Sequence, residues 1–388
     1  MKKNYLLLTA CVMLEMALGA EAPLRLWEGN SFPKASELPV LRNVTFSVIK
    51  RHEPEKDGYK FLHGVDLCWH VGRLWASYGT NPGLENTAGE IAHARVSDDC
   101  GRTWSASKLI GGGNMRGVGV SHGVMLSRGD ELWAFQGSFT NDFRCTHTRA
   151  FRYDAGRDAW AACGVVAANG FWPMQNPMKM ADGNWIMGGL RAAKGLAGVK
   201  GNRPAVAISR GEDLLHWDVV AVEEGEVVDC WGEATVDFAG PHVTLMSRPG
   251  WKSNPMVAYV ATSADFGRTW TPLRPTNLPM ASSKPFTGRL STGARYAIAS
   301  MSADGGTRRS PLVIVWSRPG EWAYSKAAVI RRAVFPEGPG ESDPGTALAY
   351  PCAVERDGKL YVGYSNNGPR RCNDNSAELA VIPLSELD

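Results

Sequence analysis

After residue 22 the sequence has no apolar run close to the ~20 residues that a membrane-spanning helix needs. It also lacks runs of basic residues, since 42 Lys and Arg are almost balanced by 39 Asp and Glu and leave a net charge of +3. The cysteines show no spacing typical of a zinc site. We therefore expect no membrane span, no nucleic acid partner, no metal site and no cofactor.

The first 22 residues have the pattern of an export signal. Lys2 and Lys3 precede an apolar run over 5–18, and Ala20-Glu21-Ala22 fits a small-x-small cleavage site. We predict a leader over 1–22 and a secreted or periplasmic protein, with a lipoprotein signal ending at Cys11 as the weaker alternative.

The rest of the chain is not divided by a linker rich in Pro, Gly or Ser. We therefore expect a single domain over 23–388, and a monomer. Of the 8 cysteines, Cys11 lies in the predicted leader, and the seven that remain are an odd number. Cys145 and Cys163 bracket a predicted hairpin and are the one candidate disulfide of an exported chain.

Two octapeptides, 97–104 and 263–270, share the pattern Ser-x-Asp-x-Gly-x-Thr-Trp, known as the Asp box. In such a hairpin turn the Asp carboxylate accepts hydrogen bonds from turn amides, the Gly tolerates a positive φ, and the Trp anchors the turn. Weaker relatives lie at 209–217 and 317–322. The boxes predict rim turns between short strands.

A longer repeat runs between these turns, each copy holding two apolar alternations around a turn. The copies begin at His63, His122, Asn176, Gly232, Lys284 and Tyr350, which are 52 to 66 residues apart. A period of roughly 50 residues is typical of propeller blades. We predict an all-β fold, a six-bladed β-propeller with four-stranded antiparallel blades. Residues 43–50 should complete the last blade beside 378–383 and close the ring.

The starts of the inner strands should face the central axis, together with nearby loops. These positions carry His63, His122, Glu233, Lys284 and Tyr350, and the loops add Glu85, Glu90, Arg203, Arg248, Arg308 and Arg309. Such a ring of charged groups is costly to desolvate unless it binds something. It therefore predicts an anion site at the hub.

The Asp boxes, the six blades and the export signal together resemble the sialidase superfamily over nearly all of residues 40–388. Glu233 followed by Arg248 resembles the family's catalytic Glu and an arginine of its carboxylate clamp. Arg308 and Arg309 precede a strand where the family places its next clamp arginine. Strand alternation lets only one of the two face the hub, and we favour Arg309.

The resemblance also implies a catalytic tyrosine and an acid. Tyr350 opens the last blade, where the family has its nucleophile, and Glu233 would polarise it. A neutral tyrosine suits a sugar whose anomeric carbon bears a carboxylate, because a carboxylate nucleophile would be repelled. The loop that carries the family's acidic Asp contains Glu85 and Glu90 instead, with Glu90 preferred because it starts a strand.

One departure concerns the first clamp arginine, which the family carries in an Arg-Ile-Pro motif. This chain has Leu62-His63-Gly64 there, so Arg116 or Arg203 would have to complete the clamp. The tripeptide His-Gly-Val occurs at 63–65 and again at 122–124, at equivalent places in two blades. We therefore expect both histidines to face the hub. Lys284 is either a substrate contact or a solvated charge.

The resemblance implies a secreted glycoside hydrolase, an exo-α-sialidase-like enzyme that releases a terminal acidic sugar from a glycan. Two alternatives remain. A polysaccharide lyase acting on uronates would use His63, His122 or Tyr350 as base and Arg116 as neutraliser. A carbohydrate-binding propeller would keep the Asp boxes without catalysis. Only a lyase releases an unsaturated product that absorbs ultraviolet light.

Overall fold

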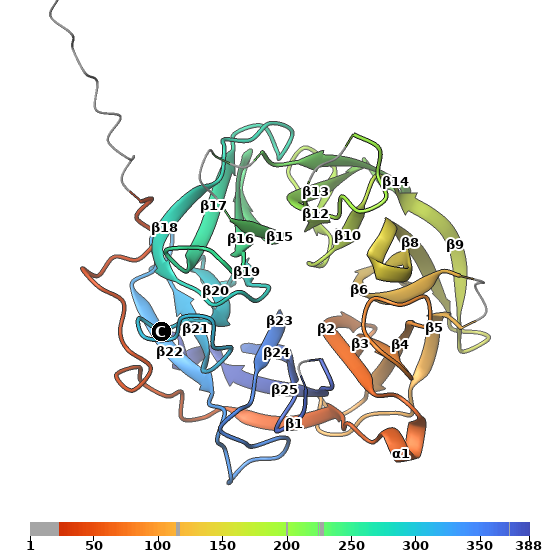
Figure 1. Cartoon of the computed structure of the whole chain (residues 1–388), viewed down its shortest axis with the longest axis horizontal. Helices are drawn as coiled ribbons and strands as arrows, with labels where there is room; N and C mark the ends of the chain where they lie inside the picture. The colour runs from red at the N-terminus through yellow and green to blue at the C-terminus, as the bar shows by residue number, and fades with distance from the viewer. Residues whose placement is uncertain (1–22, 114–116, 199–200, 224, 226–228, 372) are drawn as a thin grey trace, which may run out of the picture.

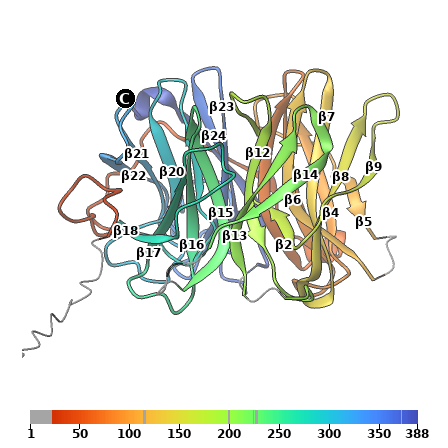
Figure 2. The ribbon, with the colours of Figure 1, turned by 90° about the horizontal axis from the view of Figure 1, so that it is seen from above.

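The computed structural model describes residues 23–113, 117–198, 201–223, 225, 229–371 and 373–388. Six antiparallel sheets stand around a central axis, and their strands run roughly along it (Figures 1 and 2). The predicted six-bladed β-propeller is thus confirmed. The predicted leader over 1–22 and Arg116 lie outside the described residues.

The blades follow one another along the chain, each beginning with its innermost strand. The first holds β2 (Phe61–His70), β3 (Arg73–Asn81), β4 (Ile91–Ser97) and β5 (Lys108–Gly112), and the second holds β6 (Gly119–Arg128), β7 (Glu131–Thr140), β8 (Arg144–Asp154) and β9 (Ala159–Ala167). The third holds β12 (Trp185–Arg191), β13 (Arg203–Arg210) and β14 (Asp213–Ala221), and its innermost strand is split into β10 (Phe171–Pro173) and β11 (Met178–Lys179), which both pair with β12.

The fourth blade holds β15 (Cys230–Ala239), β16 (His242–Pro249), β17 (Val257–Ser263) and β18 (Arg274–Pro279), and the fifth holds β19 (Phe286–Arg289), β20 (Arg295–Ser300), β21 (Leu312–Trp316) and β22 (Lys326–Arg331). The sixth holds β23 (Leu348–Arg356), β24 (Lys359–Asn366), β25 (Ser376–Pro383) and β1 (Thr45–Lys50). Short helical turns are α1 (Pro54–Asp57), η1 (Asn141–Phe143) and η2 (Leu384–Glu386). In the described part of the chain, no helix has the length and apolarity to cross a membrane.

The sixth blade joins the two ends of the described chain. Strand β1 pairs antiparallel with β25, for example Thr45 with Val381 and Phe46 with Ala380. The predicted closure by residues 43–50 is therefore confirmed. Closure pairs a strand edge that would otherwise be open to other chains.

The segment before β1 was not predicted to have a defined place. It runs along the outer strands of the fourth and fifth blades, with parallel bridges from Leu24 to Thr276 and from Trp27 to Tyr324 (Figure 1). Leu26 and Trp27 are buried in the core cluster of these blades.

Apolar side chains fill the spaces between neighbouring blades. Val124 and Phe135 of the second blade, for instance, share one buried cluster with Met187 and Ala205 of the third. Each strand gives alternate side chains to the two faces of its sheet, so both faces are packed. The ring is thus held by contacts between blades, and polar groups can occupy its axis.

Both Asp boxes adopt the same turn. Asp99 Oδ1 accepts from the backbone N–H of Thr103 at 2.8 Å, and its Oδ2 accepts from the Thr103 hydroxyl at 2.7 Å. Asp265 makes the same two bonds with Thr269, at the same distances. These hydrogen bonds lower the pKa of both carboxyls to about 2. In each box the ionised Asp carboxylate therefore holds the turn by accepting hydrogen bonds from it.

We expect Asp99→Ala to lower the free energy of unfolding by about 1 kcal/mol, because it leaves turn donors without their acceptor. The matched control is Asp98→Ala, one residue earlier in the same turn. Asp98 is exposed and makes a 2.5 Å surface ion pair with Arg73, which contributes little in water. Urea denaturation of both variants measures the difference. Equal stability of the two variants would contradict the conclusion that Asp99 stabilises the turn.

The candidate disulfide between Cys145 and Cys163 is wrong. Neither cysteine forms a disulfide. Strands β8 and β9 pair Ala150 with Gly164, so Cys163 lies opposite residues well beyond Cys145 along β8. The two cysteines bracket the hairpin in sequence without facing each other across it.

Candidate active site

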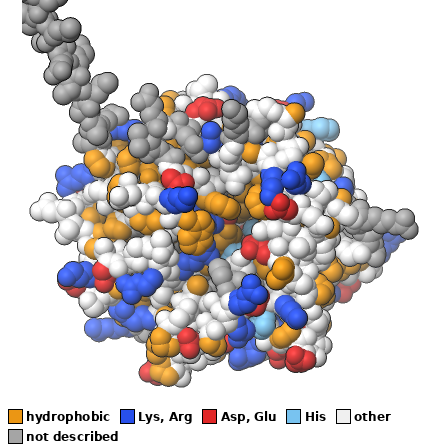
Figure 3. Space-filling view, viewed as in Figure 1, with side chains coloured by type: hydrophobic (Ala, Val, Ile, Leu, Met, Phe, Trp, Pro, Cys, Tyr) orange, Lys and Arg blue, Asp and Glu red, His pale blue; other side chains and the backbone are white. Residues whose placement is uncertain are grey.

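A cavity of about 380 Å³ opens on the axis of the ring. In the space-filling view, basic, acidic and histidine side chains gather around the central hollow (Figure 3). Its polar lining comprises His63, Glu85, Asn86, His122, Asn202, Glu233, Arg248, Arg309, Tyr350 and Asn373, and its apolar lining comprises Phe143, Trp172, Met174, Leu190, Trp231 and Trp251. The volume lies at the lower end of the ~300–1,000 Å³ usual for small-molecule sites.

Irregular inner strands aim four of these side chains into the hub. In β2, β6, β15 and β23 the pairing register shifts at or beside His63, His122, Glu233 and Tyr350. Such bulges re-aim side chains that a regular strand would bury between sheets. Gly64 is part of this arrangement, because a Cβ there would lie 2.1 Å from the His122 ring.

Tyr350 itself has a left-handed backbone, with φ of +53°. For a residue with a bulky side chain this conformation costs about 1–3 kcal/mol, and it persists only where the surroundings impose it. Strain of this kind concentrates at functional sites. We therefore regard Tyr350 as the central residue of the candidate site.

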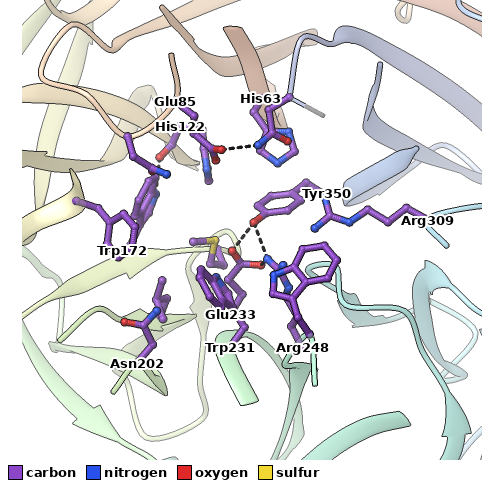
Figure 4. A pocket seen from close by; sticks show the side chains of 16 residues that line it. His63, Glu85, His122, Trp172, Asn202, Trp231, Glu233, Arg248, Arg309 and Tyr350 are labelled. Carbon is purple, nitrogen blue, oxygen red and sulfur yellow. Dashed lines mark hydrogen bonds and ion pairs between the residues drawn. The ribbon is translucent and has the colours of Figure 1, made fainter. Parts of the chain in front are cut away.

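Tyr350, Glu233 and Arg248 form one hydrogen-bonded group (Figure 4). The Tyr350 hydroxyl donates to Glu233 Oε1. Arg248 Nη1 donates to the Tyr350 oxygen at 3.1 Å and to Glu233 Oε2 at 2.8 Å. The predicted contact between Tyr350 and Glu233 is therefore present. It joins β23 of the sixth blade to β15 of the fourth, and Arg248 comes from β16, next to β15.

The electrostatics assign protonation states to this pair. Burial, reinforced by the Glu233 charge, raises the pKa of Tyr350 well above its ordinary value. Burial also acts to raise the pKa of Glu233, but Arg248 and the Tyr350 hydroxyl outweigh it and leave that pKa below its usual range. At neutral pH the group is thus a neutral phenol held against an ionised carboxylate.

Two arginines line the cavity beside this pair. Arg248 lies between the rings of Trp231 and Trp251, with its guanidinium 5.2 Å from each centroid. Arg309 lies 5.2 Å from the Trp251 centroid and donates to the Ser282 carbonyl through Nε at 3.2 Å and Nη2 at 2.9 Å. Both arginines are buried, and both line the cavity near Tyr350 (Figure 4).

The two candidate acids lie in different surroundings. Glu85 lines the cavity, and its Oε2 accepts from Asn373 Nδ2 at 2.5 Å. Glu85 is exposed to solvent at the cavity, yet the surrounding protein raises its pKa by desolvation, and the nearby Glu233 charge adds to this. Glu90 is buried beneath the loop, where its Oε1 accepts from the Asn86 backbone N–H at 2.5 Å, and burial raises its pKa to about 8. The structure thus favours Glu85 over Glu90, which was preferred from the sequence, because Glu90 directly precedes β4 and its buried side chain does not line the cavity.

Both histidines reach the hub, where they pack against Tyr350. The His63 ring centroid is 3.9 Å from that of Tyr350, and the His122 centroid is 5.7 Å from it. Asn375 Nδ2 donates to His63 Nδ1 at 3.1 Å, which places the His63 proton on Nε2. Burial lowers the pKa of His63 far below its usual value and that of His122 to about 3. Both rings are neutral at neutral pH.

The other predicted residues do not line the cavity. Arg308 is exposed and donates to the backbone oxygens of Asp304 and Gly305. Arg203 is half-buried at the start of β13, next to the lining residue Asn202.

Lys284 is buried and donates to two backbone carbonyls rather than facing solvent or the cavity. Among the described residues, the lining arginines are therefore Arg248 and Arg309. Within the same residues, no group of three or more His, Cys, Asp or Glu is placed to hold a metal.

Sequence reasoning missed several lining residues. Trp251 follows Arg248 closely, and its half-exposed ring covers both arginines. Asn373 belongs to an Asn-rich loop over 366–375 that follows the second strand of the last blade. Loops on a rigid scaffold often carry binding residues, so a polar loop beside an inner strand was the available signal.

Comparison with known proteins gives a family and a fold. The family of BNR repeat-like domains matches residues 124–362. No curated protein matches the sequence. A protein of unknown function from Dyadobacter fermentans is similar at 15% identity with a TM-score of 0.65, over 88% of this chain and 98% of that one.

Two sialidases are also similar in structure. Hadza microbial sialidase Hz136 is 12% identical with a TM-score of 0.66, over 88% of this chain and 68% of that one. The NanB sialidase of Streptococcus pneumoniae is 10% identical with a TM-score of 0.65, over 88% and 71%. At these identities the likeness establishes a shared fold.

Proposed function

The chain belongs to the BNR repeat-like domain family, and from that premise we propose that it is a glycoside hydrolase, a sialidase-like enzyme that releases a terminal acidic sugar from a glycan. The observation that carries the proposal is the Tyr350 hydroxyl, which donates to Glu233 and accepts from Arg248 inside a cavity that Arg309 also lines. A tyrosine nucleophile, its base and a cationic wall are thus together.

In the proposed first step, the Tyr350 oxygen attacks the anomeric carbon while its proton passes to Glu233. The bond from that carbon to the leaving oxygen breaks, and Glu85 protonates the departing oxygen. Water then attacks the anomeric carbon of the tyrosyl-bound sugar and gives a proton to Glu85. The bond from that carbon to the Tyr350 oxygen breaks, and Glu233 returns the proton to that oxygen. The protonation states fit these roles, since Glu233 has a lowered pKa and Glu85 a raised one.

The two buried guanidinium groups supply the contact for a substrate carboxylate, because arginine binds carboxylates in a bidentate manner. The cavity volume of about 380 Å³ favours one terminal sugar over a chain threading through the ring. We also propose that the protein is exported as a single propeller domain over 23–388 and that it acts as a monomer, as the sequence predicts.

The test is to incubate the purified protein with an aryl α-sialoside and, separately, with uronate oligosaccharides. Release of the free acidic sugar and the aryl alcohol supports the hydrolase. The neutral His63 and His122 rings beside Tyr350 keep the lyase as the competing outcome. A product with an ultraviolet-absorbing double bond would establish the lyase instead, and binding without turnover would establish the carbohydrate-binding propeller.

Arg308 and Arg309 offer a matched pair of neighbouring residues. Arg309→Met should raise KM for an aryl sialoside about 10-fold or more, because a charged hydrogen bond to the substrate carboxylate is lost. Arg308→Met should leave KM unchanged, since Arg308 is exposed outside the cavity. Steady-state kinetics on both variants measures the contrast. Equal KM values would show that Arg309 does not bind the carboxylate.

A further inference from the structure

Lys284 lies next to the cavity but outside its lining, because its amine bonds to the carbonyl of the lining residue Met174. Its side chain is only 4% exposed. The Nζ atom donates to the Pro351 carbonyl at 2.7 Å and to the Met174 carbonyl at 3.3 Å. Burying an amine is costly unless its hydrogen bonds are made. The position therefore needs an explanation beyond packing.

The two carbonyls belong to blades on different sides of the axis. Lys284 itself comes just before β19 in the fifth blade. Met174 follows β10 in the third blade, and Pro351 lies within β23 in the sixth. A single side chain thus links three blades at the hub.

Pro351 is the residue after Tyr350, inside the bulge of β23. Proline has no backbone N–H, so it cannot anchor the bulge by donating a ladder hydrogen bond. Its carbonyl is the remaining polar group, and Lys284 holds it. The Lys284 Nζ also lies 5.9 Å from the centroid of the Tyr350 ring.

We propose that Lys284 is a positioning residue that holds the strained Tyr350–Pro351 bulge and so fixes the Tyr350 hydroxyl against Glu233. The left-handed backbone of Tyr350 must be imposed by its surroundings. The hydrogen bond to the next carbonyl, tied across the axis to Met174, supplies that constraint. The effect on turnover rests on the proposed function, whereas the effect on the bulge does not.

The experiment compares Lys284→Met with Lys50→Met. Methionine keeps an unbranched chain and removes the donor. Lys50 is also buried, at 6% exposure, but it lies in β1, the outermost strand of the sixth blade, and pairs with Asp57 outside the cavity lining. Lys50→Met therefore controls for the loss of a buried lysine. We expect Lys284→Met to lower kcat on an aryl sialoside about 10- to 100-fold, as for a misplaced reacting group. The Kd of the unsaturated sialic acid analogue DANA, measured by calorimetry, should change less than about threefold, because the arginines that bind it are untouched.

A crystal structure of Lys284→Met gives the second readout. We expect the Tyr350 hydroxyl to leave hydrogen-bonding distance of Glu233. An unmoved hydroxyl, a kcat within about twofold of wild type, or a loss matched by Lys50→Met would each overturn the proposal. If the wild-type protein turns over no sialoside, the proposed function fails, and the position of the hydroxyl in the crystals still tests the role of Lys284.

Discussion

Replacing Tyr350 with phenylalanine should lower kcat on an activated sialoside on the order of 1,000-fold or more, because only the nucleophilic oxygen is lost. The ring remains, so its packing against His63 and its place in the bulge are kept. Binding of DANA, measured by calorimetry, should therefore change little. This split between turnover and binding separates a nucleophile from a packing aromatic.

The matched control for this variant is Tyr324→Phe. Tyr324 is fully buried, and its hydroxyl has no hydrogen-bond partner within the described chain. It packs with the outer strands of the fifth blade, so removing its hydroxyl should leave kcat unchanged. Near-normal turnover by Tyr350→Phe would refute the tyrosine mechanism and move the histidine-based lyase ahead of it.

Glu233→Gln tests the other half of the pair. A glutamine can still accept a hydrogen bond from the Tyr350 hydroxyl, but it cannot take the proton. We expect kcat to fall about 100-fold, the lower end of the range typical of a lost general base and less than the fall in Tyr350→Phe, with a milder effect on Kd. Steady-state kinetics and calorimetry on both variants rank the two residues.

The blades were predictable because each repeats a strand alternation and a turn. The repeat also puts four residues at equivalent positions near the starts of inner strands, namely His63, His122, Glu233 and Tyr350. Equivalent positions of the blades surround one axis, so the repeat predicts that these side chains lie close together at the hub. Closure by β1 followed in the same way, since an alternating segment without a partner stood at one end of the chain.

The misplaced residues have local causes that a repeat does not encode. Glu90 directly precedes β4, and its side chain lies under the loop, where it accepts from the Asn86 backbone N–H. Lys284 satisfies two carbonyls that only the tertiary fold brings near it. The disulfide prediction failed because the hairpin turns between Asp154 and Ala159, which places Cys163 near Ala150 and well away from Cys145.

Glu85→Gln should lower kcat/KM about 100-fold or more on a natural glycan, whose leaving oxygen must be protonated, and less than about threefold on an aryl sialoside with a good leaving group. The comparison of the two substrates isolates acid catalysis, because a structural defect would slow both. Glu90→Gln is the matched control on the same loop. Its carboxyl is protonated at neutral pH, since its pKa is about 8, and an amide oxygen can replace the acceptor for Asn86.

The pH dependence gives the same acid a second test. Glu85 must be protonated to donate, and its raised pKa keeps it protonated to higher pH than an ordinary carboxyl, so kcat/KM on the glycan should fall as pH rises through that pKa. Glu233 must be ionised, and its lowered pKa means that activity is lost only as pH falls below the usual carboxyl range. In Glu85→Gln the alkaline limb should disappear while the acid limb stays, because glutamine does not titrate. An alkaline limb that survives this substitution would assign the acid to another residue.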